Sequence, residues 1–210
     1  MRRPRFIAIQ ARHAKGPLGR LIAWIMARET HHDNLRAIEA LDLDPSDHVL
    51  DVGTGHGRAL SALAIRTPGG VVTGIDPSEL MVEIATTRNA SLVRVRRVEV
   101  LKADVGNLPF PNKAFAKAMA VHALYFWPSL GGSLKEIARV LKPGGRLVLV
   151  FRSAADKRAV AAFPADIYRF PTQTEVVSAL TAAKVDVDRI DSGEPSQRER
   201  PILITGTRRD

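Results

Sequence analysis

Short apolar segments alternate with longer amphipathic segments along most of this chain. The apolar segments predict seven strands, at residues 49–52, 71–75, 98–102, 117–122, 146–151, 185–191 and 201–206. Most of the segments between them repeat apolar residues every three or four positions, as one face of a helix does. Strands that alternate with helices are typical of a parallel sheet covered on both faces. We therefore expect an α/β fold with a doubly wound, mainly parallel sheet of seven strands.

The N-terminal segment departs from this pattern. Residues 1–17 mix arginine, lysine, proline and glycine, and we expect them to be poorly ordered. Residues 18–28 are the first predicted helix, whose apolar face consists of Leu18, Leu21, Ile22, Ile25 and Met26. Asp33 is a candidate N-cap for a second helix. We therefore divide the chain into a basic segment with a cap helix (residues 1–34) and a globular core (residues 35–210).

The most informative motif is the sequence VLDVGTGHG at residues 49–57. A strand that carries an acid, Asp51, runs into three glycines at alternate positions, and a helix begins at once. A second strand is followed by another acid, Asp76. Glycines let the backbone approach a ligand where a Cβ atom would collide, and an acid in the second position can accept hydrogen bonds from ribose hydroxyls. This order of elements predicts a nucleoside-binding site.

The spacing of the glycines distinguishes between nucleoside ligands. A dinucleotide site reads G-x-G-x-x-G, but the third glycine position here is Arg58, which is bulky and charged. A phosphate-binding loop would end in Gly-Lys followed by Ser or Thr, whereas this loop ends in His56, Gly57 and Arg58. The pattern G-x-G-x-G with an acid two residues ahead resembles the first motif of the class I S-adenosylmethionine (SAM) dependent methyltransferases.

The resemblance continues, in the order of the family's motifs, over roughly residues 35–207. The later motifs are matched by LKAD at 101–104, by LPFP at 108–111 with AFAKAMAVHALYFW at 114–127, and by EIARVLKPGGRLVLV at 136–150. One departure is Phe115-Ala116-Lys117, where the family usually has Asp after Phe. The resemblance implies a Rossmann-like fold whose last strand is antiparallel.

The resemblance also implies the cofactor SAM and its product S-adenosylhomocysteine (SAH). In this family the acid at the position of Asp51 and the glycine-loop backbone hold the methionine part of the cofactor. Asp76 would bind the ribose, Asp104 would face the adenine amino group, and the N–H of Val105 would face the ring. The expected cofactor-binding residues are Asp51, Gly53, Thr54, Gly55, Gly57, Asp76, Pro77, Asp104, Val105 and His122.

Composition and charge narrow the possibilities. The chain has 210 residues, enough for one domain, and no run of 18 apolar residues that would span a membrane. It lacks cysteine, and its six histidines show no ligand spacing, so we expect no metal. Its N-terminus lacks a secretory pattern, and we expect a cytoplasmic protein. The formal net charge is +9, with basic clusters in residues 1–30 and 88–102.

Methyl transfer needs few catalytic side chains, because the cofactor carries the leaving group and the protein mainly aligns the reactants. An acceptor oxygen or nitrogen of high pKa would still need a base. The candidates are His122, after the fourth strand, and His31 or His32; the alternatives are a pocket wall for His122 and a surface position for the pair. The substrate pocket is expected to contain the aromatic residues Tyr125, Trp127 and Tyr168. Packing in the core is the alternative for Trp127.

We therefore predict a SAM-dependent methyltransferase that acts on a small molecule, and an apolar, lipid-like or quinone-like acceptor is one form of this prediction. The alternatives are a nucleic-acid methyltransferase, suggested by the basic charge, and a non-catalytic SAM-binding protein. Against nucleic acid, residues 122–125 read HALY where base-flipping enzymes have Asn/Asp-Pro-Pro-aromatic. The basic helix at 18–28 has three interpretations: a cap over the cofactor, an interface with a partner, and a contact with an anionic membrane. A homodimer and the identity of the acceptor atom stay open.

Overall fold

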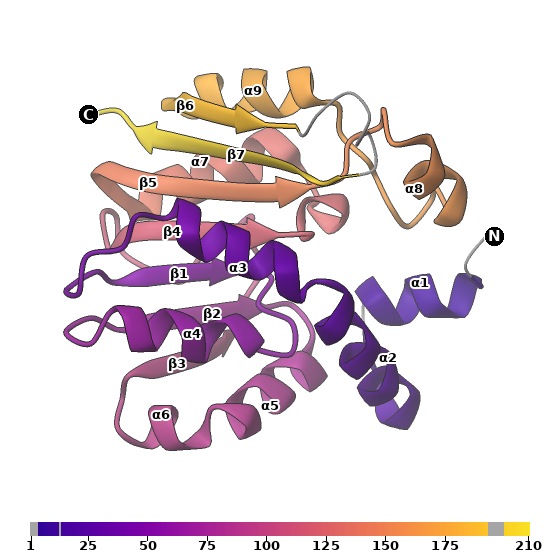
Figure 1. Ribbon diagram of the computed structural model, residues 1–210, viewed down its shortest axis with the longest axis horizontal. Coiled ribbons are helices and arrows are strands. Elements are labelled where there is room, and N and C mark those ends of the chain that lie inside the picture. Colours follow the sequence, from indigo (N-terminus) through magenta and orange to yellow (C-terminus); the bar gives the residue numbers. More distant parts are fainter. Residues whose placement is uncertain (1–3, 13, 193–199) are drawn as a thin grey trace.

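A computed structural model describes residues 4–12, 14–192 and 200–210. Its centre is one sheet of seven strands in the order β3-β2-β1-β4-β5-β7-β6 (Figure 1). The strands are β1 (Val49–Val52), β2 (Val72–Asp76), β3 (Val98–Lys102), β4 (Phe115–Val121), β5 (Leu141–Phe151), β6 (Val185–Asp191) and β7 (Ile202–Arg208). β7 pairs antiparallel with β5 and β6, and the other pairs are parallel. The predicted doubly wound sheet with an antiparallel last strand is confirmed.

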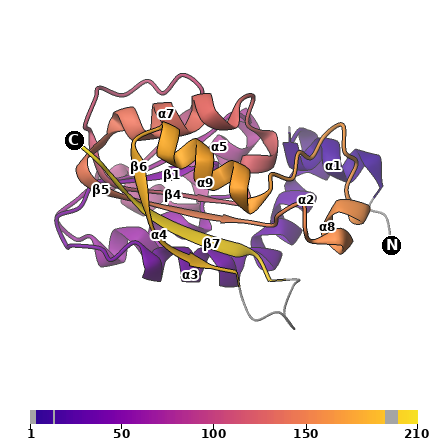
Figure 2. The same cartoon turned by 90° about the horizontal axis from the view of Figure 1, so that it is seen from above.

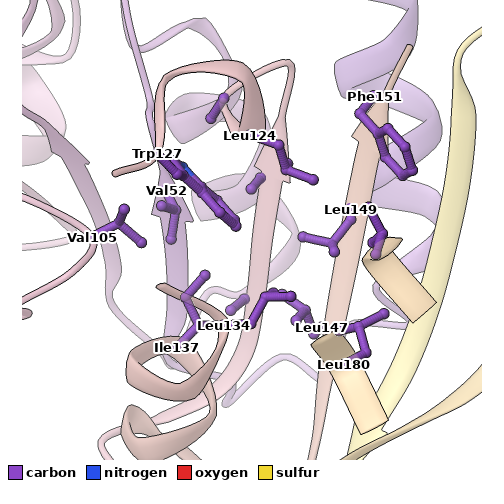
Figure 3. Close-up of a cluster of buried hydrophobic side chains, with 14 of the residues drawn as sticks. Val52, Val105, Leu124, Trp127, Leu134, Ile137, Leu147, Leu149, Phe151 and Leu180 are labelled. Atoms are coloured by element: carbon purple, nitrogen blue, oxygen red, sulfur yellow. The ribbon is translucent and has the colours of Figure 1, made fainter. Parts of the chain in front are cut away.

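Helices cover both faces of this sheet (Figure 2). On one face lie α3 (His31–Ala40) and α4 (Arg58–Arg66), whose apolar residues join Val49, Val72 and Met119 in one buried cluster. On the other face, α7 (Leu130–Val140) and α9 (Gln173–Ala182) enclose a larger cluster, part of which Figure 3 shows around Leu134 and Leu147. The remaining core helices are α5 (Glu79–Arg88), α6 (Ala90–Arg94) and α8 (Lys157–Ala162). The central strands β1 and β2 are buried along their whole length, as expected for a parallel sheet covered on both faces, whereas the edge strands β3 and β6 are partly exposed.

The N-terminal segment is more regular than the sequence predicts. Residues 1–17 were expected to be poorly ordered, but α1 (Arg5–Arg12) is a helix whose Ala8 is fully buried. α2 (Gly16–Glu29) follows the predicted helix. Both lie beyond the carboxyl ends of the parallel strands (Figure 1). The boundary drawn between residues 34 and 35 falls inside α3, so a continuous helix joins this segment to the core.

Local contacts set the ends of two elements. α5 ends at Arg88, where the side chain of the next residue, Asn89, donates hydrogen bonds to the carbonyls of Gly57 and Ala85. β5 begins at Leu141 instead of residue 146, since Leu141 pairs with Phe115 across a register shift.

Where the family usually has Asp after Phe, this chain has Ala116. The ammonium of the next residue, Lys117, donates a hydrogen bond to the carbonyl of Asp42. Most of the segment between the last two strands, residues 193–199, lies outside the described residues. None of the helices in the described ranges has the length and apolar character needed to cross a bilayer.

Candidate active site

The glycine loop connects the end of β1 to the start of α4. The N–H groups of Gly53 and Thr54 both donate to the carbonyl of Ile75, at 2.9 Å, and so tie the loop to β2. Gly55 has a φ of +55°, and a Cβ atom placed there would meet no atom within 4 Å. The backbone at Gly55 therefore faces open space, which leaves room for a ligand at short range.

Two buried carboxyl groups hold this loop. Asp51 accepts a hydrogen bond from the hydroxyl of Thr54 at 2.7 Å. Asp76 accepts from the N–H of Gly55 at 3.0 Å and from the N–H of Ser78 at 2.9 Å. Burial raises the pKa of Asp51 to about 7, against the effect of its Thr54 hydrogen bond, and burial raises the pKa of Asp76 to about 6.

A first cavity, the glycine-loop cavity, has a volume of about 130 Å³ and lies at the carboxyl ends of β1, β2 and β3. Its wall contains nine of the ten residues expected to bind the cofactor: Asp51, Gly53, Thr54, Gly55, Asp76, Pro77, Asp104, Val105 and His122. The expected residue missing from this wall is Gly57. With a φ of +70° at the N-terminus of α4, Gly57 would place a Cβ atom 2.6 Å from the Cβ of Ala85. Its role is therefore the close approach of α4 to α5.

His56 also lines the glycine-loop cavity, although no sequence pattern predicted this role for it. It is buried, and its Nδ1 accepts a hydrogen bond from the N–H of Arg58 at 3.2 Å. Burial lowers the pKa of His56 to about 4, and the charges of Arg88 and Arg58 act in the same direction. The imidazole is therefore neutral at physiological pH.

A second cavity, the aromatic cavity, has a volume of about 520 Å³ and shares Ala11, Thr30, His122 and Phe126 with the first. Its aromatic wall consists of Tyr125, Phe126, Phe163, Tyr168 and Phe170. The rings pack closely, with centroids 4.3 Å apart for Phe163 and Tyr168 and 4.9 Å apart for Tyr125 and Phe170. The N-terminal helices close the opposite side with Ile7, Ile22 and Ile25.

The three residues expected in a substrate pocket therefore divide between two places. Tyr125 and Tyr168 line the aromatic cavity. Trp127 is 6% exposed and packs in the core beside Val52 and Leu124, and it reaches only the glycine-loop cavity (Figure 3). The expectation of Trp127 as a substrate-pocket residue is corrected by this position, because the chain after β4 forms a short 3₁₀ turn, Leu124–Phe126, that turns the indole inward.

His122 connects the two cavities and both of its ring nitrogens have partners. Nε2 lies 2.9 Å from Oδ2 of Asp33, and Nδ1 lies 2.9 Å from the hydroxyl of Tyr125. That hydroxyl oxygen already accepts from the N–H of Arg152 at 2.6 Å. The Tyr125 proton is therefore free to bond Nδ1, which leaves the ring proton on Nε2, facing Asp33.

The charges around His122 favour an ionised Asp33. Burial opposes ionisation of this carboxyl, but its hydrogen bond with His122 and the charges of His122 and Arg36 outweigh burial, so its pKa is lowered. Arg36 Nη1 lies 3.2 Å from Asp33, and its Nη2 lies 3.2 Å from Asp191 on β6. Burial raises the pKa of Tyr125. The result is a continuous chain of hydrogen bonds from Tyr125 through His122 to Asp33.

The other candidate base, His31, is the first residue of α3 and lines neither cavity. The neighbouring Thr30 and Asn34 line the glycine-loop cavity instead, and Asp33, expected as an N-cap, reaches His122. Thr30 takes the N-cap position of α3. Within the described ranges, no group of three histidine or carboxylate side chains is placed to hold a metal ion.

Known proteins resemble this chain in sequence and in fold. A family described as a methyltransferase domain matches residues 50–149. A demethylmenaquinone methyltransferase of Tropheryma whipplei (strain Twist) is 36% identical over 154 residues, which cover 72% of this chain and 62% of that protein. Residues 50–149 are therefore similar to a class I methyltransferase domain, and the chain spans less than two thirds of the length of this relative. The matched segment runs from β1 into β5, and so contains both the glycine loop and His122.

Solved structures extend the likeness to the whole fold. The structure of a putative methyltransferase in complex with the Haloferax volcanii Trm112 methyltransferase activator has a TM-score of 0.78, with 22% identity and 99% of each chain covered. A geranyl diphosphate C-methyltransferase of Streptomyces coelicolor A3(2), in complex with Mg²⁺, geranyl diphosphate and SAH, has a TM-score of 0.71 at 16% identity, covering 92% of this chain and 86% of that one. At these identities the likeness concerns the fold.

Proposed function

We propose that this chain is a SAM-dependent methyltransferase whose acceptor is an apolar, flat or lipid-like small molecule. The observation that carries this proposal is the meeting of two cavities at His122, one lined by the glycine loop and its acids and the other by aromatic rings. Ligand pockets are usually apolar cavities with a few polar groups that orient the ligand. The names of two similar proteins, which act on demethylmenaquinone and geranyl diphosphate, agree with an apolar acceptor.

The glycine-loop cavity suits SAM in each of its parts. The bare backbone at Gly55 and the buried carboxyl of Asp51 offer groups for the methionine end, and the start of α4 favours a carboxylate ligand. The carboxyl of Asp76 faces the cavity between its two N–H partners and retains lone pairs for ribose hydroxyls. Asp104 and Val105 follow β3 at the far end, where the adenine would lie.

When bound, SAM supplies an electrophilic methyl group on a sulfonium. The side chains of this protein align the acceptor and exclude water, and alignment of this kind lowers a barrier by roughly 7–11 kcal/mol. We propose that Tyr125, His122 and Asp33 receive the proton of an acceptor hydroxyl. The acceptor proton passes to the oxygen of Tyr125 while the tyrosine proton moves to Nδ1 of His122. The resulting imidazolium is stabilised by Asp33.

The rival functions have less support in the structure. Arg97, in the second basic cluster, donates to the carbonyls of Ala64, Thr67, Pro68 and Gly70 and so stabilises the end of α4. Part of the positive charge that suggested a nucleic-acid substrate therefore serves to stabilise the fold. A non-catalytic SAM-binding protein would not need the 520 Å³ aromatic cavity beside the glycine loop. A cytoplasmic location and a homodimer stay predictions.

The first test is a calorimetric titration with SAH, with NADH as the control ligand. We expect SAH to bind and NADH not to bind, and SAH at about 100 times its Kd should add roughly 2.7 kcal/mol to the free energy of unfolding. Methyl transfer from labelled SAM is then measured with a quinol carrying an isoprenoid chain, a small hydrophilic phenol and single-stranded RNA. Turnover of RNA alone would contradict the proposal.

A further inference from the structure

The N-terminal helices α1 and α2 expose an unusual amount of apolar surface. Five of the ten exposed large apolar side chains in the described part of the chain lie on these two helices, and each is between 41% and 54% accessible. They are Phe6, Ile9, Leu18, Leu21 and Ile25. Exposed apolar residues that gather in one place mark an interaction site more often than scattered ones do. This group is here called the N-terminal apolar surface.

The N-terminal apolar surface continues into the aromatic cavity. Ile25 belongs to both, because it is exposed and also lines the cavity, and Ile7 and Ile22 lie on the same two helices on the cavity side. α8 lies at the same end of the sheet (Figure 1), lines the cavity with Ala159 and Ala162 and exposes Val160. An apolar molecule moving from this surface into the cavity would meet apolar side chains along the way.

The charge of the same segment is strongly positive. Residues 4–12 and 14–29 contain five basic residues and one acidic residue, Glu29. Arg12, Lys15 and Arg20 are exposed, and Arg20 forms a surface ion pair with Glu83. Basic residues around exposed apolar side chains are the pattern of a helix that lies in the interface of an anionic bilayer. No described helix can cross a bilayer, so such a contact would be peripheral.

We propose that α1 and α2 dock this protein on an anionic lipid surface, with the N-terminal apolar surface in the headgroup region. The acceptor then enters the aromatic cavity directly from the membrane. The evidence for docking comes from α1 and α2 alone. The route of the acceptor into the cavity also depends on the proposed methyl transfer. A second copy of the chain would cover apolar surface equally well, but two copies would bring together segments that are both basic.

The test is flotation of the full chain with phosphatidylcholine vesicles, with and without phosphatidylglycerol. We expect binding at least about tenfold tighter to the vesicles with phosphatidylglycerol at low salt, and a loss of that difference at high salt. The double substitution Leu18→Ser with Leu21→Ser should weaken binding about tenfold, because it removes two exposed apolar side chains that line neither cavity.

The matched control is Ile65→Ser on α4, which removes a side chain that is 77% exposed outside the N-terminal helices, at the opposite end of α4 from the glycine loop. This variant should bind vesicles like the unchanged protein. Thermal unfolding of each variant confirms that its fold is intact. The charge variant Lys15→Glu with Arg20→Glu should lose binding only to the anionic vesicles, and Arg66→Glu with Arg94→Glu is its control.

Equal binding to both vesicle types, or unchanged binding of the Leu18 and Leu21 variant, would overturn the proposal. A dimer in solution that the same variant dissociates, without vesicle binding, would overturn it in favour of a second copy. Flotation needs neither cofactor nor turnover. A protein that binds SAH but no vesicles would therefore contradict the docking alone, and one that binds vesicles but not SAH would contradict the proposed function alone.

Discussion

The glycine-loop cavity and the aromatic cavity share His122, but they draw their walls from the chain in different ways. The main binding groups of the first come from three short stretches that each follow a neighbouring strand, at residues 51–56, 75–78 and 103–105. The wall of the second combines α1, α2, α3, the turn after β4 and residues 152–170. The first contains the carboxyl groups of Asp51, Asp76 and Asp104 and the glycine-loop backbone, and the second contains five aromatic rings.

This difference predicts which property of the protein a substitution in each cavity would change. A site made by adjacent strand ends is positioned by the sheet, so its ligand contacts are fixed once the sheet forms. A site closed by helices from the N-terminal segment depends on tertiary contacts such as the one between Asp33 and His122, which lie 89 residues apart in the sequence. Substitutions in the first cavity should therefore affect cofactor affinity, and substitutions in the second should affect turnover.

The largest expected effect is a loss of cofactor affinity in the glycine-loop cavity. Asp76→Ala should weaken SAH binding by about 100-fold, because charge-assisted hydrogen bonds to the ribose are each worth about 1.5–3 kcal/mol. Calorimetry measures the loss, and far-ultraviolet circular dichroism shows whether the fold is intact. Asp104→Ala is the comparison and should weaken binding less, since this exposed acid is one of several contacts at the adenine end. A larger loss at Asp104 would reverse the roles assigned to the two acids.

The second expected effect is a pH dependence of stability, which is caused by two buried acids in the glycine-loop cavity. The pKa values of Asp51 and Asp76 are raised in the folded chain to about 7 and 6, above the usual value near 3.8. Their contribution to stability is therefore present at low pH and is lost as the pH rises through 6 and 7. Between pH 5 and pH 8 the ligand-free protein should lose on the order of 2 kcal/mol of unfolding free energy from Asp51.

Denaturant titrations at both pH values measure this loss, and Asp51→Asn should show less of it than the unchanged protein. SAH binding should change in the opposite direction and strengthen from pH 5 to pH 8, because the ionised carboxyl groups are better hydrogen-bond acceptors. Equal pH slopes for the two proteins would show that Asp51 titrates as an exposed acid does.

The third expected effect is on turnover, and it distinguishes the aromatic cavity from the glycine-loop cavity. Asp33→Asn should lower kcat about tenfold, because the imidazolium of His122 loses its charged partner, while the Kd of SAH stays within about twofold. The matched control is Asp191→Asn, which removes the other carboxylate of Arg36 without touching His122. A pH profile of kcat that is unchanged by Asp33→Asn would contradict the proposed proton path.

The smallest expected effect tests the Tyr125 hydroxyl. Tyr125→Phe should reduce the free energy of unfolding by about 1–2 kcal/mol, because the N–H of Arg152 and Nδ1 of His122 lose a common partner. It should also lower turnover of hydroxyl acceptors while cofactor affinity is kept. Phe170→Leu, which keeps an apolar wall but removes a ring, is the control for packing. Unchanged turnover in Tyr125→Phe would mean that the proton leaves by another route.

The sequence predicted the fold and the first cavity because both depend on local patterns. β1, β3 and β6 have the predicted ends, and nine of ten expected cofactor residues line one cavity. Gly57 lies outside this wall, and in a sequence a glycine required for helix packing looks like a glycine required for ligand approach. The difference is set by Ala85, which is 28 residues away.

The second cavity was only partly predictable, for a physical reason. Asp33 has the sequence context of an N-cap, and nothing local indicates that its carboxyl reaches His122, just after β4. α1 was missed because proline, glycine and arginine dominate the first residues, although the short apolar stretch from Phe6 to Ala11 folds against α2. Trp127 follows its alternative of packing in the core, because the 3₁₀ turn Leu124–Phe126 directs the indole inward.

The inward position of Trp127 has a spectroscopic consequence. Its indole lies in the wall of the glycine-loop cavity, and the only other tryptophan in the sequence is Trp24. In a Trp24→Phe protein, all tryptophan emission comes from a ring that a bound nucleoside would contact or shield from water. The protein thus contains its own fluorescent reporter for the cofactor, and stopped-flow quenching can follow cofactor arrival and departure without any added label.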